Sequence, residues 1–215
     1  MNIILQHWTG ELDELGKLSS VNISAYAARL GADYRILRGN VFRAHLCSPC
    51  QKLYMLDEIF DAYDTVVMLD MDMFAATAEN VFELEGTGLF SQYTEGVFSR
   101  CLRDHPHLSN RGYAFWGGAI YRLPLAMRQK LRAHINEDEM RQFNGSYKDE
   151  GIMHRLACLA RVPQDRLPDR WCQCSYLPHP ETAAMIHIRT KVAPEGPKRT
   201  KMENYLDLRA RGIIE

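Results

Sequence analysis

The chain has 215 residues, of which 46% are hydrophobic and 25% are charged. This length suits one well-packed domain, and the composition excludes collagenous, low-complexity and broadly disordered proteins. Lys and Arg number 26 against 27 Asp and Glu, so the net charge is -1 and excludes a global electrostatic attraction to nucleic acid or anionic lipid. We therefore expect any charged ligand to be bound by a local cluster of side chains.

The sequence also gives expectations about location. The longest apolar stretch, 114–121, is shorter than the roughly 20 residues that a transmembrane helix needs, so no membrane span is expected. The first residues lack a basic segment followed by a long apolar run, which favours a cytoplasmic protein. Six cysteines without a secretion signal predict reduced thiols rather than a disulfide framework.

The first part of the chain predicts a strand, a helix and a second strand. The apolar run 3–5 is typical of a buried strand, and apolar residues at 23, 26, 27 and 30 predict a helix. Ser19 or Ser20 would cap that helix and Gly31 would end it, before a strand over 33–37. Together these elements indicate a βαβ unit with parallel strands.

The same pattern then repeats. Pro49 suits the first turn of a second helix, and the apolar run 65–69 predicts a buried strand. Beyond a polar region over 91–112, the remaining expected elements are an apolar segment over 113–123, a helix from about 124, a turn at 144–145, a helix over 149–160, a strand over 185–188 and a helix from about 202. We expect a single α/β domain over 1–215 with a mostly parallel central sheet flanked by helices.

Asp70-Met71-Asp72 directly follows the predicted buried strand. Open α/β sheets bind their ligands at the carboxyl ends of strands, and residues two apart in an extended chain point to the same side. Both carboxylates can therefore reach one Mg²⁺ or Mn²⁺ ion. A solvated turn is the alternative for such a tripeptide alone, but its position after a buried strand favours a metal site.

A histidine and a basic loop come late in the chain. His187 lies in an apolar run, where a single histidine is more often structural than a ligand. Gly196-Pro197 shapes a loop able to direct the Lys198 ammonium at phosphate oxygens, although a solvated basic edge would have the same composition. The basic residues that follow His187 are Arg189, Lys191, Lys198, Arg199 and Lys201.

In their order along most of the chain, these motifs resemble the GT-A-fold nucleotide-sugar glycosyltransferases, particularly the glycogenin-like and lipopolysaccharide-galactosyltransferase-like retaining enzymes. Two features depart from that family: its asparagine is missing from the small-residue segment, and its Asp-Gln-Asp segment is matched only in part. The matching elements are the loop 6–9 after the first strand, Lys52, Asp70 to Asp72, the small-residue segment 115–121, the acidic 149–151, and His187 followed by Gly196-Pro197-Lys198.

The resemblance implies a role for each of these residues. Asp70, Asp72 and His187 would bind Mn²⁺ or Mg²⁺, with Met71 beside the nucleotide sugar. Lys198 would hold the diphosphate, and Lys52 would reach the ribose or the donor sugar. Trp8 and Thr9 would contact the base, although a tryptophan at such a place is more often part of the core. An aromatic face beside two glycines would suit the floor of a sugar site at Trp116, Gly117 and Gly118, and a buried strand with a bulge is the alternative.

Asp149 and Glu150 are the carboxylates expected to face the reacting sugar, as nucleophile, ion-pair stabiliser or hydrogen-bond orienter. Acids in the first turn of a helix also complement its dipole without any catalytic role, and that alternative stays open. The resemblance implies transfer from a UDP-sugar to a glycan or glycoprotein acceptor, with retention, in the cytoplasm of a bacterium or of a virus-infected host cell. Residues 1–75 would form the nucleotide-binding part, and 76–215 the acceptor side with the metal and diphosphate loop.

Parts of the sequence are also compatible with other functions. Phosphatases of the haloacid dehalogenase superfamily also have Asp-x-Asp after a strand, but usually with Thr where this chain has Phe74, and on their first strand. The Gly-rich N-terminal loop of sugar-nucleotide pyrophosphorylases is absent. A non-catalytic carbohydrate-binding protein of the same fold is a further alternative. The four cysteines at 47, 50, 172 and 174 suggest a structural zinc site only weakly, because the second pair is tightly spaced.

Overall fold

The structure is a computed structural model that describes residues 1–84, 118–141, 148–162, 167–176, 179–190 and 199–215. Its main sheet has the strand order β2-β1-β3-β5. Strand β1 (Asn2–Trp8) pairs in parallel with β2 (Asp33–Arg38) and with β3 (Thr65–Leu69), whereas β5 (Ile120–Pro124) is antiparallel to β3. The sheet is therefore mostly parallel, as the sequence predicts. Every residue of β3 is buried, which explains its continuous apolar run.

Helix α1 (Glu14–Arg29) connects β1 to β2 and begins earlier than predicted. The prediction of Ser19 or Ser20 as its cap is wrong, because Asp13 caps the helix by accepting a hydrogen bond from Gly16 N at 2.7 Å. Ser19 instead lies buried inside the helix and donates to the carbonyl of Met73 at 2.7 Å. The predicted end is correct, since Gly31 has a φ of +65° just after the helix.

The helix predicted at Pro49 is a 3₁₀ helix, η1 (Ser48–Leu56), followed by η2 (Glu58–Phe60). Cys50, Leu53 and Leu56 are all buried, and their spacing of three residues places them on one side of a helix with three residues per turn. Among the described residues, α3 (Leu125–Arg132), α4 (Glu137–Arg141) and α5 (Lys148–Ala160) follow β5, close to the positions predicted for two of them.

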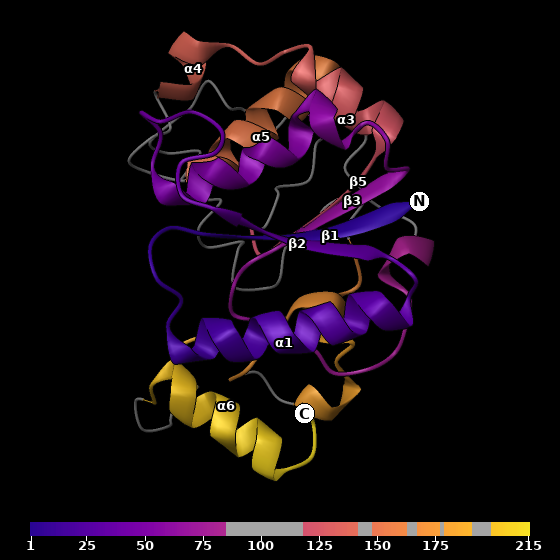
Figure 1. Ribbon diagram of the computed structural model, residues 1–215, viewed down its shortest axis with the longest axis vertical. Coiled ribbons are helices and arrows are strands. Elements are labelled where there is room, and N and C mark those ends of the chain that lie inside the picture. The colour runs from indigo at the N-terminus through magenta and orange to yellow at the C-terminus, as the bar shows by residue number, and fades with distance from the viewer. Residues whose placement is uncertain (85–117, 142–147, 163–166, 177–178, 191–198) are drawn as a thin grey trace.

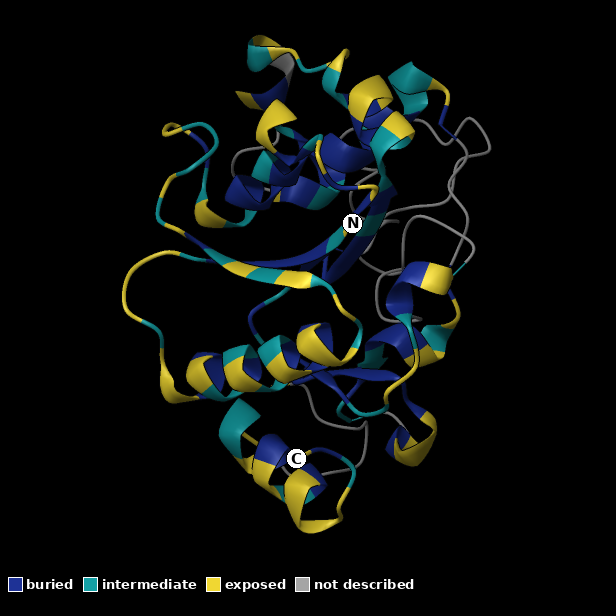
Figure 2. Cartoon of the chain, turned by 45° about the vertical axis from the view of Figure 1, so that its right-hand side comes forward, coloured by how far each residue is buried: buried dark blue, intermediate teal, exposed yellow. Residues whose placement is uncertain are grey.

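The helices cover both faces of the sheet. Figure 1 shows α1 on one face, and α3, α5 and η1 on the other. The buried Arg128 of α3 donates to the carbonyls of Leu123, Phe60 and Tyr63, which ties this layer to β5 and η2. In Figure 2 most strands and the inward sides of the helices are buried, whereas the edge strand β2 and the outward side of α1 carry exposed residues.

A second, smaller sheet was not predicted. Its order is β4-β7-β6, formed by β4 (Met73–Ala75), β7 (Met185–His187) and β6 (Gln173–Cys174). Only β7 was expected from the sequence, because it lies in the apolar run 185–188. The other two strands, of three and two residues, are too short to show a hydrophobic period. The described chain ends with α6 (Lys201–Ala210), close to its predicted start. The short 3₁₀ helices of this half are η3 (Val81–Glu83), η5 (Asp169–Cys172) and η6 (Pro180–Thr182).

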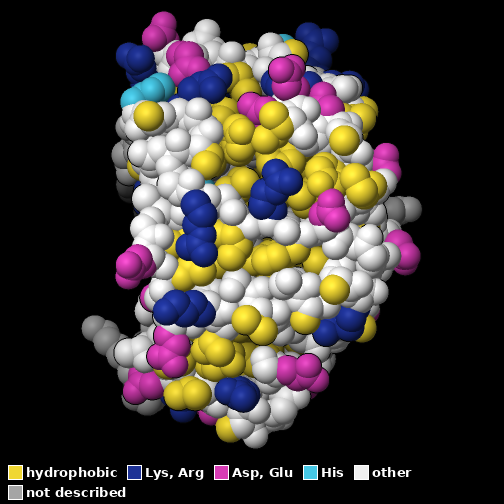
Figure 3. Space-filling model, viewed as in Figure 1, with side chains coloured by type: hydrophobic (Ala, Val, Ile, Leu, Met, Phe, Trp, Pro, Cys, Tyr) yellow, Lys and Arg dark blue, Asp and Glu magenta, His cyan; other side chains and the backbone are white. Residues whose placement is uncertain are grey.

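Several predicted features lie outside the described residues: the polar region 91–112, the beginning of the apolar segment over 113–117, and the turn at 144–145. On the face seen in Figure 3, basic and acidic side chains are interspersed rather than gathered into one block, in keeping with the net charge of -1. No helix of the described part is long and apolar enough to cross a membrane.

Candidate active site

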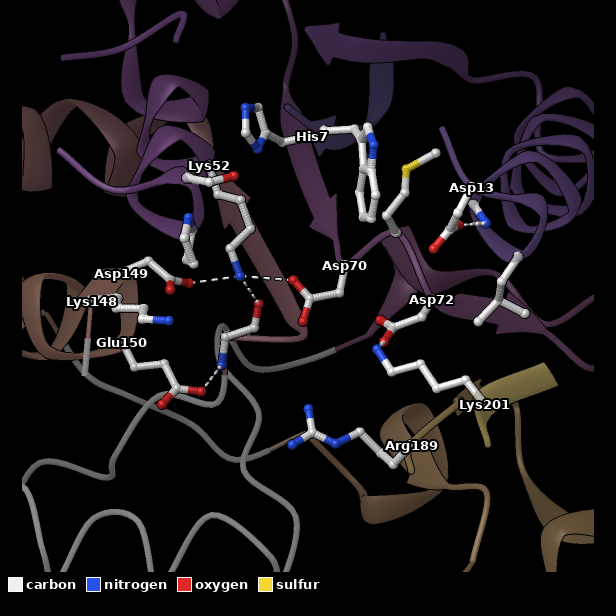
Figure 4. A pocket seen from close by; sticks show the side chains of 17 residues that line it. His7, Asp13, Lys52, Asp70, Asp72, Lys148, Asp149, Glu150, Arg189 and Lys201 are labelled. Atoms are coloured by element: carbon white, nitrogen blue, oxygen red, sulfur yellow. Dashed lines mark hydrogen bonds and ion pairs between the residues drawn. The ribbon is translucent and has the colours of Figure 1, made fainter. Parts of the chain in front are cut away.

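A cavity of about 460 Å³ opens at the carboxyl ends of β1 and β3. Figure 4 shows that charged side chains from several elements converge on it. Its position agrees with the rule that open α/β sheets bind ligands beyond the carboxyl ends of their strands. The side chains and backbone that line it come from His7, Trp8, Asp13, Leu15, Gly16, Ser48, Pro49, Lys52, Asp70, Met71, Asp72, Gly118, Lys148, Asp149, Glu150, Arg189 and Lys201.

Asp70, Asp72 and His187 form a candidate metal centre beside this cavity. One ligand atom from each lies within 4.8 Å of the others, and no other such group occurs within the described residues. His187 Nε2 is 3.1 Å from Asp72 Oδ1 and 3.8 Å from Asp70 Oδ2. This nitrogen is buried yet forms no hydrogen bond of good geometry within the described structure. Two carboxylates and an imidazole with an unsatisfied nitrogen are a donor set that fits a divalent cation.

The small sheet brings these three residues together. Met73 pairs with His187 across β4 and β7, which places the histidine opposite the loop that carries both aspartates. Ile188 N donates to the carbonyl of Asp72 at 2.9 Å, and Asp70 N donates to the carbonyl of Ala119 at 2.9 Å. The candidate metal centre therefore depends on a pairing between segments more than 110 residues apart.

Lys201 forms an ion pair with Asp72 Oδ2 at the edge of the centre. Burial would raise the pKa of Asp72, but the adjacent His187 and Lys201 lower it well below its usual value. Arg189, which follows β7, lines the same cavity. The site thus combines fixed carboxylates with cationic side chains suited to an anionic ligand.

Lys52 connects the metal centre to a second pair of carboxylates. Its ammonium lies 2.7 Å from Asp70 Oδ1, 2.7 Å from Asp149 Oδ2 and 2.6 Å from the carbonyl oxygen of Gly118. Burial alone would lower the pKa of Lys52, but the charges of Asp149 and Asp70 raise it above its usual value. Lys52 is therefore charged at neutral pH, and all three of its donors have an acceptor.

Asp149 and Glu150 begin α5 and face the cavity from the opposite side. Tyr121 donates from its hydroxyl to Asp149 Oδ2 at 2.9 Å, and Gly118 N donates to Glu150 Oε1 at 2.8 Å. Burial raises the pKa of Asp149, while Lys52 opposes that rise. Burial and the charge of Asp149 raise the pKa of Glu150 to about 7. A Cβ at Gly118 would lie 2.7 Å from Asp149 Oδ2, so only glycine fits there without a shift.

The side chain of Gln6 is hydrogen-bonded to the loop that carries Asp70 and Asp72, a role that was not predicted. Its fully buried amide donates to the carbonyl of Asp70 and to Ser19 Oγ, both at 3.0 Å, and its oxygen accepts from the Tyr34 hydroxyl at 2.6 Å. A buried glutamine within an apolar strand is the one sequence signal that could have identified it, because such a side chain needs hydrogen-bond partners.

The structure places most of the predicted site residues around the cavity. Trp8, Lys52, Met71, Gly118 and the four acids at 70, 72, 149 and 150 line it, and His187 adjoins it through Asp72. Thr9 is at the edge, where its hydroxyl lies 2.8 Å from Ser48 Oγ. Trp116, Gly117 and Lys198 lie outside the described residues. Four further residues line the cavity: His7 belongs to the predicted loop 6–9, Arg189 and Lys201 belong to the predicted basic stretch after His187, and Asp13 was not predicted.

The described cysteines do not gather into one metal site. Cys47 Sγ and Cys50 Sγ are 3.5 Å apart at the start of η1, whereas Cys172 and Cys174 lie at η5 and β6. All four are free thiols in the described structure.

The sequence matches no protein-family profile and no curated protein. Its fold, in contrast, is similar to several solved structures. A glycosyltransferase involved in glycosylation of the major capsid of PBCV-1 has a TM-score of 0.59 at 9% identity, with 97% of this chain and 98% of that one covered. The chain has a GT-A glycosyltransferase fold.

Two further solved structures are also similar to this chain in fold. An active-site mutant of LgtC has a TM-score of 0.57 at 13% identity, with both chains covered completely. The bifunctional glycosyltransferase WbbM has a TM-score of 0.57 at 12% identity, with 94% of this chain and 51% of that one covered, so this chain spans about half of WbbM. At these identities the likeness is one of fold, and activity has to be argued from the site.

Proposed function

We propose that the protein is a metal-dependent glycosyltransferase that moves a sugar from a UDP-sugar to a glycan or glycoprotein acceptor with retention of configuration. The observation that carries this proposal is that Asp70 contacts both halves of one cavity. Its Oδ2 faces His187 of the metal centre, and its Oδ1 accepts from Lys52, which also holds Asp149. A cation-binding group and a pair of carboxylates thereby share one site, as transfer from a sugar diphosphate requires.

The metal side of the cavity suits the departing diphosphate. Asp70, Asp72 and His187 would hold Mn²⁺ or Mg²⁺, which when bound supplies positive charge to the diphosphate. Arg189 and Lys201 line the cavity beside them, and in our proposal Lys198 joins these cations. Fixed cations stabilise the negative charge that develops as the nucleoside diphosphate leaves, and this charge is greatest in the transition state.

The carboxylate side suits the reacting sugar. Lys52 and Tyr121 hold Asp149 in one orientation, so its negative charge can stabilise positive charge that develops on the sugar ring. Glu150, with a pKa raised to about 7, can exchange a proton at neutral pH and orient a sugar hydroxyl. We assign Trp8 and Thr9 to the base, Met71 to the nucleotide sugar, and Trp116, Gly117 and Gly118 to the floor of the sugar site.

Lys52 is assigned to the ribose or donor sugar side of the same site. Its ammonium already contacts three acceptors, so a ligand hydroxyl would have to share or replace one of them. We place the acceptor against the 76–215 half of the chain and the nucleotide against the 1–75 half.

The test is ligand binding with and without Mn²⁺. A ligand at 100 times its Kd stabilises a protein by about 2.7 kcal/mol, which for 150–250 residues raises Tm by about 5–10 °C. We expect UDP and UDP-sugars to do so only with Mn²⁺, and calorimetry and UDP release to show Mn²⁺-dependent binding and turnover. Asp72→Asn should abolish both. Asp207→Asn is the matched control, because Asp207 pairs only with surface arginines within the described structure.

The outcome separates the alternatives. Indifference of Tm to every nucleotide, with or without Mn²⁺, would refute the transferase and favour a binding protein of the same fold. Metal-dependent hydrolysis of simple phosphate esters without any UDP binding would favour a phosphatase.

A further inference from the structure

Each oxygen of the Asp72 carboxylate has a nitrogen neighbour, and that of Oδ2 is a charged ammonium. His187 Nε2 lies 3.1 Å from Oδ1, and the Lys201 ammonium is paired with Oδ2. A metal ion that binds this carboxylate must therefore displace or crowd a lysine that already neutralises it. We propose that Lys201 is a built-in competitor of the metal, which occupies Asp72 before the cation binds and then moves to the diphosphate of the donor; this inference rests on the metal-dependent function proposed above.

The backbone of Lys201 is firmly positioned. Lys201 is the first residue of α6, whose start is fixed by reciprocal bonds between Thr200 and Glu203. Asn204, on the same first turn, donates to the carbonyl of Arg189 at 2.6 Å. Because Arg189 follows the strand that carries His187, the backbone of Lys201 is held close to the candidate metal centre whether or not its ammonium is paired with Asp72.

The side chain of Lys201, in contrast, is only partly enclosed. It is 41% exposed, whereas that of Lys52 is 8% exposed and contacts three acceptors. Within the described residues, the only partner of the Lys201 ammonium is Asp72. A lysine ammonium on a flexible four-carbon stem can change partners at little cost, which a fully enclosed one cannot.

The charges decide which partner Lys201 takes. A divalent cation attracts the Asp72 carboxylate more strongly than a single ammonium does at the same distance, and once bound it repels that ammonium. A diphosphate that arrives with the cation brings new negative charge to the cavity that Lys201 and Arg189 both line. Lys201 therefore weakens the binding of free metal and strengthens the binding of the metal together with a diphosphate.

This exchange predicts effects of opposite sign in one variant. We expect Lys201→Met to bind Mn²⁺ alone at least about fivefold more tightly than the wild type, the lower end of ordinary coupling between sites. In saturating Mn²⁺ the same variant should bind UDP at least about fivefold more weakly. Free Mn²⁺ can be counted by electron paramagnetic resonance, and UDP affinity by calorimetry, so neither measurement depends on turnover.

Two control variants isolate the contact. Lys148→Met removes another lysine of the same cavity, one that forms no ion pair with Asp72 within the described structure, and should change Mn²⁺ affinity by less than about twofold. Lys201→Arg keeps the charge and should stay close to the wild type for Mn²⁺ alone. Circular dichroism should show all three variants folded, because the Lys201 side chain is 41% exposed and Asp72 keeps His187 as a neighbour when Lys201 is replaced.

The possible failures are distinguishable. If the wild type binds Mn²⁺ and Asp72→Asn does not, but Lys201→Met binds Mn²⁺ no more tightly than the wild type, the competition is refuted while the metal site stands. Unchanged UDP affinity in Lys201→Met would refute the move to the diphosphate. If neither the wild type nor Lys201→Met binds Mn²⁺, the proposed metal-dependent function fails together with this inference.

Discussion

Replacing Lys52 with Met removes the charge that joins the two halves of the site. Met keeps the length and apolar character of the side chain, so the change is mainly the loss of the ammonium and its three contacts. Asp149, whose side chain is only 5% exposed, would then keep a hydrogen bond from Tyr121 but lose its counter-ion. Asp70 is 27% exposed and can be partly solvated.

The expected cost follows from leaving Asp149 unpaired. Removing one partner of a buried ion pair destabilises a protein by about 3–5 kcal/mol. For a chain of this size that corresponds to a fall in Tm of about 10 °C. Burial already raises the pKa of Asp149, and without Lys52 it should rise further. A carboxyl whose pKa is higher in the folded than in the unfolded state destabilises the protein as the pH rises above the unfolded-state pKa. The loss of unfolding free energy in Lys52→Met should therefore be larger at pH 8 than at pH 5.

Urea unfolding at pH 5 and pH 8 measures the loss of unfolding free energy and its dependence on pH. Lys148→Met is the control for loss of an exposed lysine from the same cavity. Asp149→Asn in the Lys52→Met background removes the unpaired charge and should recover at least half of the lost free energy of unfolding. If Lys52→Met is as stable as the wild type, or if Asp149→Asn recovers nothing, the buried pair is not what holds this part of the site together.

Two other variants test the carboxylate side. Gly118→Ala places a Cβ 2.7 Å from Asp149 Oδ2, so we expect about 1–3 kcal/mol of destabilisation and, from displaced carboxylates, about 100-fold slower sugar transfer. Gly31→Ala, at a φ of +65° with open space around its Cβ position, should cost about 1 kcal/mol without slowing transfer; equal kinetic effects of the two would contradict a specific role for Gly118. The pKa of Glu150 is raised to about 7, so ionisation of this carboxyl lowers the free energy of unfolding of the wild type as the pH rises from about 4.5 to 7. Glu150→Gln lacks this ionisation, so its free energy of unfolding should rise by about 2 kcal/mol relative to that of the wild type between pH 5 and pH 8. Parallel pH profiles of stability for Glu150→Gln and the wild type would exclude this titration.

Strong local signals made much of the main sheet predictable. The apolar runs of β1 and β3 and the helical period near Tyr26 locate the first βαβ unit, and Gly31 marks the end of α1. The start of α1 was missed because the capping choice between Asp13 and the two serines depends on where the helix is anchored, not on residue type. The short strands β4 and β6 carry no period to detect.

The sequence by itself determined which side chains were available for chemistry: two aspartates after a buried strand, an acidic helix start and a basic stretch after His187. Only the tertiary structure decided their partners. The pairing of Met73 with His187 assembles the candidate metal centre, and Gly118 lies close to Asp149 and Glu150 on the carboxylate side of the cavity. Lys201 meets Asp72 across 129 positions of the sequence. Contacts of this kind depend on how strands and helices pack, and no local pattern of residues encodes them.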